Sequence, residues 1–190
     1  MKMPTLVTSR GLRLPESACI VSYLMDEYAD IGPSLRAKDV DARACASLAI
    51  RVHDVYVVAI QGAMYRGPMD RSTRASQIKE IAKQLNVLEE IAGRTRGVYI
   101  AGEEASDADA SLFPTFVFME FLLPKFFGWH DVFANRPNLR AWYSAMMTDP
   151  DAKAVRDEVR GGLEAWDVAG RFEKVGVVAD VADTSFTWAY

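Results

Sequence analysis

Cysteine and histidine are scarce in this sequence, and each shortage excludes a class of site. The 190 residues contain 2 Cys and 2 His. Cys19 and Cys45 lie in segments with helical periodicity, without CxxC spacing or a nearby histidine, so neither a zinc site nor a dithiol motif is predicted. His53 and His130 have no serine, cysteine or second histidine at the spacing of a triad or a metal site. We therefore expect a reducing compartment such as the cytoplasm, no metal and no catalytic histidine.

Positive charge is also limited. Lys and Arg number 22 against 26 Asp and Glu, which gives a net charge of -4 and a pI near 5.3. A nucleic-acid binder neutralises phosphates with a basic face, and anionic membrane surfaces attract basic segments. Because the basic residues are scattered among the acidic ones, we expect no nucleic-acid partner and no binding to an anionic membrane surface.

The sequence has no apolar run long enough to cross a bilayer. Residues 1–10 contain neither a long apolar stretch nor an Arg-rich amphipathic one, so no targeting peptide is predicted there. Residues 110–123 are apolar on nearly every face, but a span of about 30 Å needs about 20 such residues. Pro114, Glu120 and Pro124 also interrupt or end this run. We expect a helix buried at the centre of a bundle and no transmembrane segment.

The opening of the chain has the pattern of a small β-hairpin followed by a helix. Residues 5–7 are β-prone, residues 9–11 form a turn signal, and residues 12–14 could form a second strand. Ser17 is the predicted N-cap of a helix that ends at 32–33, where Gly and Pro stand together.

The remainder of the chain is dominated by helical periodicity. Apolar residues recur every three or four positions, and Gly or Pro marks most of the boundaries. No such period is present in the final twenty residues, which are expected to form an extended tail. The predicted helices span residues 37–66, 73–92, 110–123, 136–149 and from 152 to about 166.

A capping box is predicted at the start of the central helix. Ser106 stands three residues before Asp109, so each side chain can satisfy the backbone N–H of the other. Asp109 is therefore interpreted as structural. Trp142, Tyr143 and Trp166 fall on or beside apolar helical stripes and are interpreted as core aromatics.

Several motifs, in this order and spacing, resemble the glutathione S-transferase superfamily. Two resemble the third strand and the following helix of its thioredoxin-like domain, and the others resemble the start of the central helix and the later helices of its all-α domain. The motifs are Met3-Pro4-Thr5-Leu6-Val7, Glu16-Ser17 with Ile20 and Tyr23-Leu24, Tyr99 to Gly102 followed by Ser106-x-Ala108-Asp109, and Pro137-x-Leu139-x-x-Trp142 with Asp149-Pro150.

The resemblance implies a mostly α fold, a glutathione-transferase-like helical bundle with a short β-hairpin and helix as the remnant of a thioredoxin-like domain. The expected parts are a partial thioredoxin-like domain at 1–31, an all-α domain at 36–170 and a tail at 171–190. The resemblance begins at the third strand, so the first strand, first helix and second strand have no counterpart in this sequence. The hydroxyl or thiol that activates glutathione lies in that segment of the family, and no catalytic residue is assigned.

The resemblance also implies part of a glutathione site. The backbone at Met3, before a cis-Pro4, would pair with the cysteinyl part of glutathione; Ser17 would bind the γ-glutamyl carboxylate and Glu16 would orient that group. Lys2 could also reach a carboxylate. Ser17 as a simple helix cap and Pro4 as an ordinary trans proline remain open alternatives.

Two interpretations of function follow, beside a third in which the motif matches are accidental. In the first, the chain is a non-catalytic binding or structural subunit whose truncated sheet is covered by a protein partner or a larger assembly. The resemblance also implies a homodimer, formed in the family between the thioredoxin-like domain of one subunit and the helical domain of the other. In the second, the chain is part of an active transferase that conjugates glutathione to hydrophobic electrophiles. Met64 and Tyr65 could line the hydrophobic substrate site or pack against the hairpin.

Overall fold

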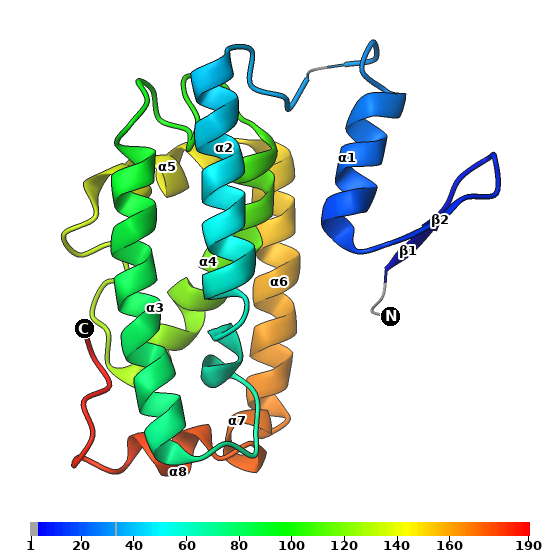
Figure 1. The fold of residues 1–190 in the computed structure, drawn as a ribbon. Helices are drawn as coiled ribbons and strands as arrows, with labels where there is room; N and C mark the ends of the chain where they lie inside the picture. Colours follow the sequence, from blue (N-terminus) through cyan, green and yellow to red (C-terminus); the bar gives the residue numbers. More distant parts are fainter. Residues whose placement is uncertain (1–3, 33) are drawn as a thin grey trace.

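The computed structural model describes residues 4–32 and 34–190, in which a small hairpin and helix stand beside a larger bundle of helices (Figure 1). This arrangement confirms the predicted mostly α fold with a short β-hairpin. The elements follow in the order β1 (Thr5–Val7), β2 (Arg13–Pro15), α1 (Ser17–Glu27), α2 (Val40–Val52), η1 (His53–Val57), η2 (Gln61–Met64), α3 (Arg71–Ala92), α4 (Asp107–Phe127), α5 (Pro137–Met146), α6 (Pro150–Val168), α7 (Arg171–Lys174) and α8 (Val177–Val181).

The two strands form an antiparallel hairpin whose turn depends on a glycine. Thr5 pairs with Pro15 in the register of β1 and β2. In the turn, the hydroxyl of Thr8 accepts the N–H of Leu12 at 3.1 Å. Gly11 has a φ of 79°, a left-handed backbone that glycine adopts without steric cost. The second strand therefore runs one residue later than the predicted 12–14.

Helix α1 packs on the hairpin but not into the bundle. Arg10 of the turn pairs with Glu27 of α1 at 2.9 Å, and the Tyr23 hydroxyl donates to the same carboxylate at 3.1 Å. None of the residues in α1 is buried. The hairpin and α1 accordingly lie to one side of the bundle, beyond α2 and α6 (Figure 1).

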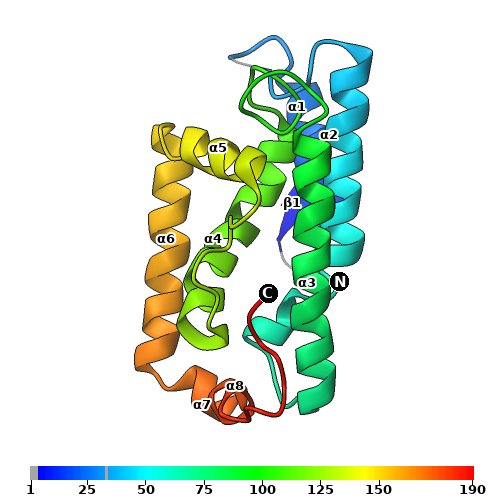
Figure 2. The same ribbon diagram turned by 90° about the vertical axis from the view of Figure 1, so that its left-hand side faces the viewer.

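Helix α4 forms the centre of the bundle, as its all-round apolar sequence predicts. In Figure 2 it lies between α6 and α3. Leu112, Phe116 and Leu123 are each 0% exposed, so the predicted burial is confirmed. Helix α4 is longer than the predicted 110–123 and meets the minimum length and apolar composition for a membrane span, so the length argument against a span is wrong. However, 56% of that apolar window is buried inside the protein. Core helices of bundles commonly have this composition.

The predicted continuous helix at 37–66 is wrong, because the chain leaves α-helical geometry after α2. A π-helical turn, η1, follows at His53–Val57, and a short 3₁₀ helix, η2, follows at Gln61–Met64. Several β-branched residues stand here, and such residues lose side-chain freedom against the preceding helical turn. The His53 ring also forms a hydrogen bond with Thr115 of α4, which adds a tertiary contact at the break.

The segment 171–190, expected to be extended, contains the short helices α7 and α8. Asp180 of α8 accepts the Nε–H of the fully buried Arg74 at 2.7 Å. Further along, the Nε1–H of Trp129 donates to the carbonyl of Trp188 at 2.8 Å. Helices of four or five residues are too short to show a helical period, so the sequence pattern could not reveal them.

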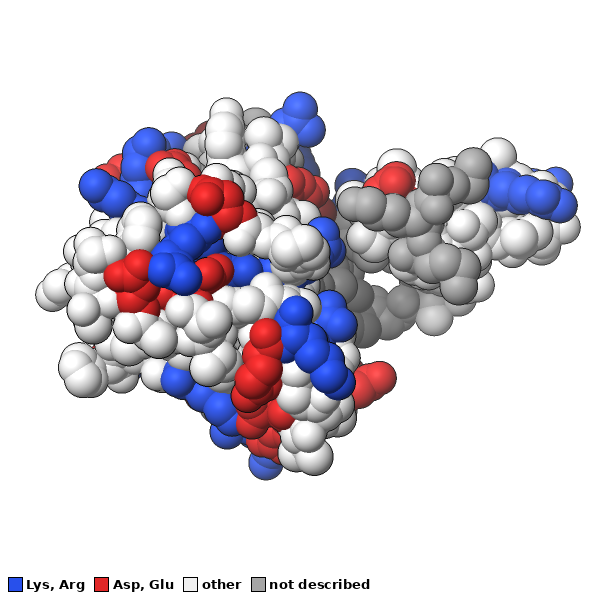
Figure 3. Space-filling view, turned by 90° about the horizontal axis from the view of Figure 1, so that it is seen from below, with Lys and Arg blue, Asp and Glu red and all other residues white. Residues whose placement is uncertain are grey.

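Basic and acidic side chains are interspersed over the lower face of the bundle (Figure 3).

Candidate functional site

The hairpin brings three of the predicted site residues together at its open end. Thr5 faces Pro15 in the strand register, so Pro4 immediately precedes the paired residues and Glu16 and Ser17 immediately follow them. All three are exposed to solvent. Met3, the fourth predicted residue, lies outside the described residues, as does Lys2. The isomer of the bond between Met3 and Pro4 is therefore not described either.

Glu16, not Ser17, is the N-cap of α1, which corrects the predicted cap. Its φ of 70° is a left-handed backbone that costs a non-glycine residue of order 1–3 kcal/mol. Its side chain makes no capping hydrogen bond, and Ser17 is the first helical residue. The first N–H groups of a helix need acceptors and carry the positive end of its dipole. The start of α1 is thus an exposed group of donors next to a strained residue.

A second candidate element is an apolar groove of about 430 Å³ between α4 and α6, referred to below as the α4–α6 groove. Its volume lies within the range of small-molecule sites. Its lining consists of Pro114, Phe118, Val155, Glu158, Val159, Gly162, Leu163 and Trp166.

Three aromatic rings pack together beside this groove. The Tyr65 ring centroid lies 5.3 Å from that of Phe118 and 6.0 Å from that of Trp166. Arg171 lies over the Trp166 ring, 4.3 Å from its centroid, a cation–π geometry. Trp166 is therefore both a packing residue and part of the groove surface. The core interpretation holds for Trp142, which is 0% exposed.

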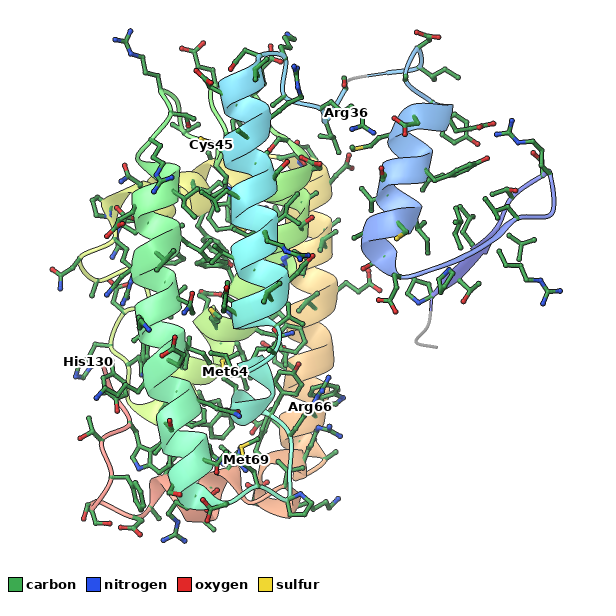
Figure 4. All side chains as sticks on the ribbon, viewed as in Figure 1. Arg36, Cys45, Met64, Arg66, Met69 and His130 are labelled. Carbon is green, nitrogen blue, oxygen red and sulfur yellow. The ribbon has the colours of Figure 1, made fainter. Side chains whose placement is uncertain are left out.

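Met64 and Tyr65 belong to the interior of the bundle. Met64 is 0% exposed and Tyr65 is 7% exposed. Figure 4 shows Met64 within the bundle, well away from the hairpin. The alternative in which these residues pack against the hairpin, which the sequence left open, is therefore wrong. Tyr65 supports the groove from behind through its contacts with Phe118 and Trp166.

His53 is joined by hydrogen bonds to its exposed neighbour Asp54 and to the buried Thr115, a partner that sequence spacing did not indicate. Its Nε2 lies 2.8 Å from the Thr115 hydroxyl, and its Nδ1 lies 2.8 Å from Asp54. Burial lowers the pKa of His53, while the adjacent Asp54 opposes that shift. His53 is 6% and Thr115 7% exposed, so the hydroxyl is not open to a substrate. The hydrogen bonds of His53 tie η1 to α4 rather than forming a reactive site.

The Asp109 carboxylate holds together the start of α4, as the predicted capping box implies. Oδ2 accepts the N–H and the hydroxyl of Ser106, both at 2.7 Å. Oδ1 accepts the N–H of Ile100 at 2.9 Å and the indole N–H of Trp142 at 2.8 Å. Burial raises the pKa of Asp109, while these four donors oppose the rise. The structural interpretation of Asp109 is confirmed.

A depression of about 860 Å³ is a separate cleft whose arginines pair with carboxylates of the same lining. Arg140 pairs with Asp131, and Arg160 pairs with Glu164 at 3.0 Å. His130, also in its lining, lies on the side of the bundle away from α1 (Figure 4). We assign this cleft no part in the candidate site, because it is remote from the hairpin. Across residues 4–32 and 34–190, no group of three or more His, Cys, Asp or Glu could hold a metal ion.

Comparison with known proteins identifies the helical part of the chain. Residues 65–145 match the family model described as glutathione S-transferase, C-terminal domain. These residues include α3, α4 and all of α5 except its last residue. A curated relative, glutathione S-transferase omega-1 of Sus scrofa, is 26% identical over 159 residues. Residues 65–145 therefore form a C-terminal domain of the glutathione S-transferase superfamily.

The match to the pig transferase covers 83% of this chain but only 62% of the relative. Glutathione transferase F2 of Populus trichocarpa superposes with a TM-score of 0.67 at 21% identity, covering 84% of this chain and 76% of the poplar chain. A glutathione S-transferase of Methylobacillus flagellatus, solved with glutathione bound, has a TM-score of 0.58 at 24% identity, covering 81% and 75%. These structural likenesses show the transferase fold.

Proposed function

We propose that this glutathione S-transferase-like chain binds glutathione at the open end of its hairpin and an apolar co-ligand in the α4–α6 groove. In this proposal the residues of the chain hold the ligands but do not activate the thiol. A neutral thiol has a pKa of about 8.5, so its activation needs a donor or positive field at the sulfur. No residue of this chain takes that role by the family resemblance.

The backbone of Glu16 is the observation that carries the proposal. A left-handed glutamate with no capping bond is unfavourable by itself, and such strain gathers at ligand sites. Here it leaves the first donors of α1 without a side-chain cap, beside the Ser17 hydroxyl. A γ-glutamyl carboxylate would accept hydrogen bonds from these donors and from that hydroxyl. Pro4, at the same end of the hairpin, would place the neighbouring backbone along the peptide.

Calorimetric titration of the 190-residue chain with glutathione tests this assignment. Ser17→Ala should weaken binding roughly tenfold or more, because a hydrogen bond to a charged group contributes about 1.5–3 kcal/mol. Ser22→Ala is the matched control, since Ser22 is exposed on the same helix away from its start. Glu16→Gly should relieve the backbone strain while removing the carboxylate, so binding should fall without loss of thermal stability. Equal affinities for the parent chain, Ser17→Ala and Glu16→Gly would contradict the site.

The second interpretation, an active transferase, has a separate test. It predicts that the protein isolated from its source is heavier than 21.1 kDa and carries a serine, tyrosine or cysteine in an additional first βα turn. Conjugation of glutathione to chlorodinitrobenzene by the 190-residue chain itself would refute the non-catalytic proposal.

We also propose that a further polypeptide covers the hairpin and α1. Within the described residues, β1 pairs only with β2, and a two-stranded hairpin is marginal alone in water. Tyr28 and Ile31, which follow α1, remain 54% and 72% exposed, and such exposed apolar residues and unpaired strand edges are often covered by a partner. The covering polypeptide is either a protein partner or a second copy of this chain. Light scattering on material purified from the source should then show a mass above that of one chain, and a monomer at micromolar concentration would refute this.

A further inference from the structure

Gly161 and Gly162 stand in the middle of α6, where the packing of the chain does not require glycine. Apart from proline, glycine is the least favourable residue inside a helix. Neither has a left-handed backbone, and a Cβ built on either would meet no atom within 4 Å. The pair therefore costs helix stability without relieving any contact inside the described chain.

The two glycines differ in what they face. Gly162 lines the α4–α6 groove, whereas Gly161 is not part of that lining. Trp166 is four residues after Gly162 and so stands beside it on the same face of α6. A side chain at position 162 would enter the groove beside Trp166, whose ring packs edge-on against Phe118 with centroids 6.4 Å apart, while one at position 161 would project elsewhere.

The charge of the groove indicates what it can hold. Glu158 is the one charged residue of its lining, and no Lys, Arg or His of the described chain joins it there. An anionic ligand would lose its hydration and meet a carboxylate, while Arg171, the cation over the Trp166 ring, is not part of the lining. The rest of the lining is apolar and includes the aromatic side chains Phe118 and Trp166, which suits an aromatic ligand. The occupant that fits is an uncharged aromatic small molecule.

We propose that Gly162 determines which co-ligands enter the groove, because it keeps open the part of the groove that lies over α6 beside Trp166. The proposal rests on the proposed function, in which this groove holds the apolar co-ligand. The helix stability that glycine costs at position 162 would thus be offset by the binding of a co-ligand.

The matched substitutions Gly162→Leu and Gly161→Leu test the proposal in the full chain. The readout is fluorescence titration with N-phenyl-naphthylamine, an uncharged aromatic probe. Gly162→Leu should weaken probe binding at least tenfold, and Gly161→Leu should leave it within twofold. Both should raise the thermal midpoint by up to about 2–4 °C, since each replaces a helix-interior glycine with a good helix former.

A milder pair, Gly162→Ala and Gly161→Ala, keeps the test valid if a leucine disturbs folding, and the loss of affinity should again be confined to position 162. Equal binding by both variants of a pair, with the parent chain binding the probe, would overturn the role of Gly162 and leave the proposed function in place. Failure of the parent chain to bind the probe would instead overturn the groove as a co-ligand site, and the role of Gly162 with it.

Discussion

Replacement of Arg74 by methionine should strongly destabilise the protein, because this buried side chain holds the carboxyl-terminal segment onto the bundle. Arg74 is 0% exposed. Its guanidinium donates to Asp180 at 2.7 Å and to the carbonyls of Ala63, Arg66 and Val175 at 2.5, 3.1 and 3.1 Å. Four acceptors from η2, the following loop and the α7–α8 segment would lose their donor together.

The expected loss follows from the burial of the pair. Removal of one partner of a buried ion pair typically costs 3–5 kcal/mol, and Asp180 would keep only the partly exposed Arg71 as a partner, so the loss should lie toward the lower end of this range. For a chain of this size that corresponds to a fall in the thermal midpoint of roughly 6–20 °C. Urea denaturation gives the free energy directly. Replacement of both partners, Arg74→Met with Asp180→Leu, should cost less than Arg74→Met alone, since no uncompensated charge then remains.

Arg71 provides the control for this experiment. It also pairs with Asp180, at 3.2 Å, but its side chain is 39% exposed. Exposed ion pairs contribute about 0–1 kcal/mol, so Arg71→Met should have a small effect. The reasoning is wrong if Arg71→Met and Arg74→Met unfold at the same urea concentration.

Two further predictions concern His53 and Gly67. Burial lowers the pKa of His53 in the folded protein below its ordinary value of about 6.5. As the pH falls, His53 is therefore protonated in the unfolded chain before it is protonated in the folded one, so the free energy of unfolding should decline from about pH 6.5 downward. Urea midpoints at pH 8.0 and 5.5 should differ less for His53→Gln than for the parent chain, and equal differences would contradict this. Gly67→Ala should cost about 1–3 kcal/mol, because its Cβ would lie 2.1 Å from the Val175 carbonyl oxygen. Gly161→Ala is the control in open space, and similar midpoints for both would be inconsistent with tight packing at Gly67.

The long helices could be predicted from the sequence because each has a repeated apolar stripe and a local stop signal. Helix α3, predicted over 73–92, spans Arg71–Ala92. The all-apolar segment after Ser106 became the buried α4, including its capping box. The break after Val52 was not predictable in the same way. It depends on the contact of His53 with Thr115, which is 62 residues away in the sequence.

The candidate site was only partly predictable. The family motifs indicated Pro4, Glu16 and Ser17, but no sequence rule indicates a left-handed backbone at a glutamate, since that conformation is imposed by the hairpin-to-helix junction. The α4–α6 groove also escaped prediction, because residues from Pro114 to Trp166 line it and only tertiary packing brings them together.

The bond between the Trp129 indole and the Trp188 carbonyl has a practical consequence for anyone who handles this protein. Trp188 is 8% exposed, so residues two positions from the final tyrosine are part of the interior. A purification tag fused directly after Tyr190, or a deletion of the last few residues, would disturb the aromatic cluster that Trp188 forms with Phe127 and Phe186. Labels for the experiments above are better attached at the amino end, with a spacer that leaves Pro4 and Glu16 accessible.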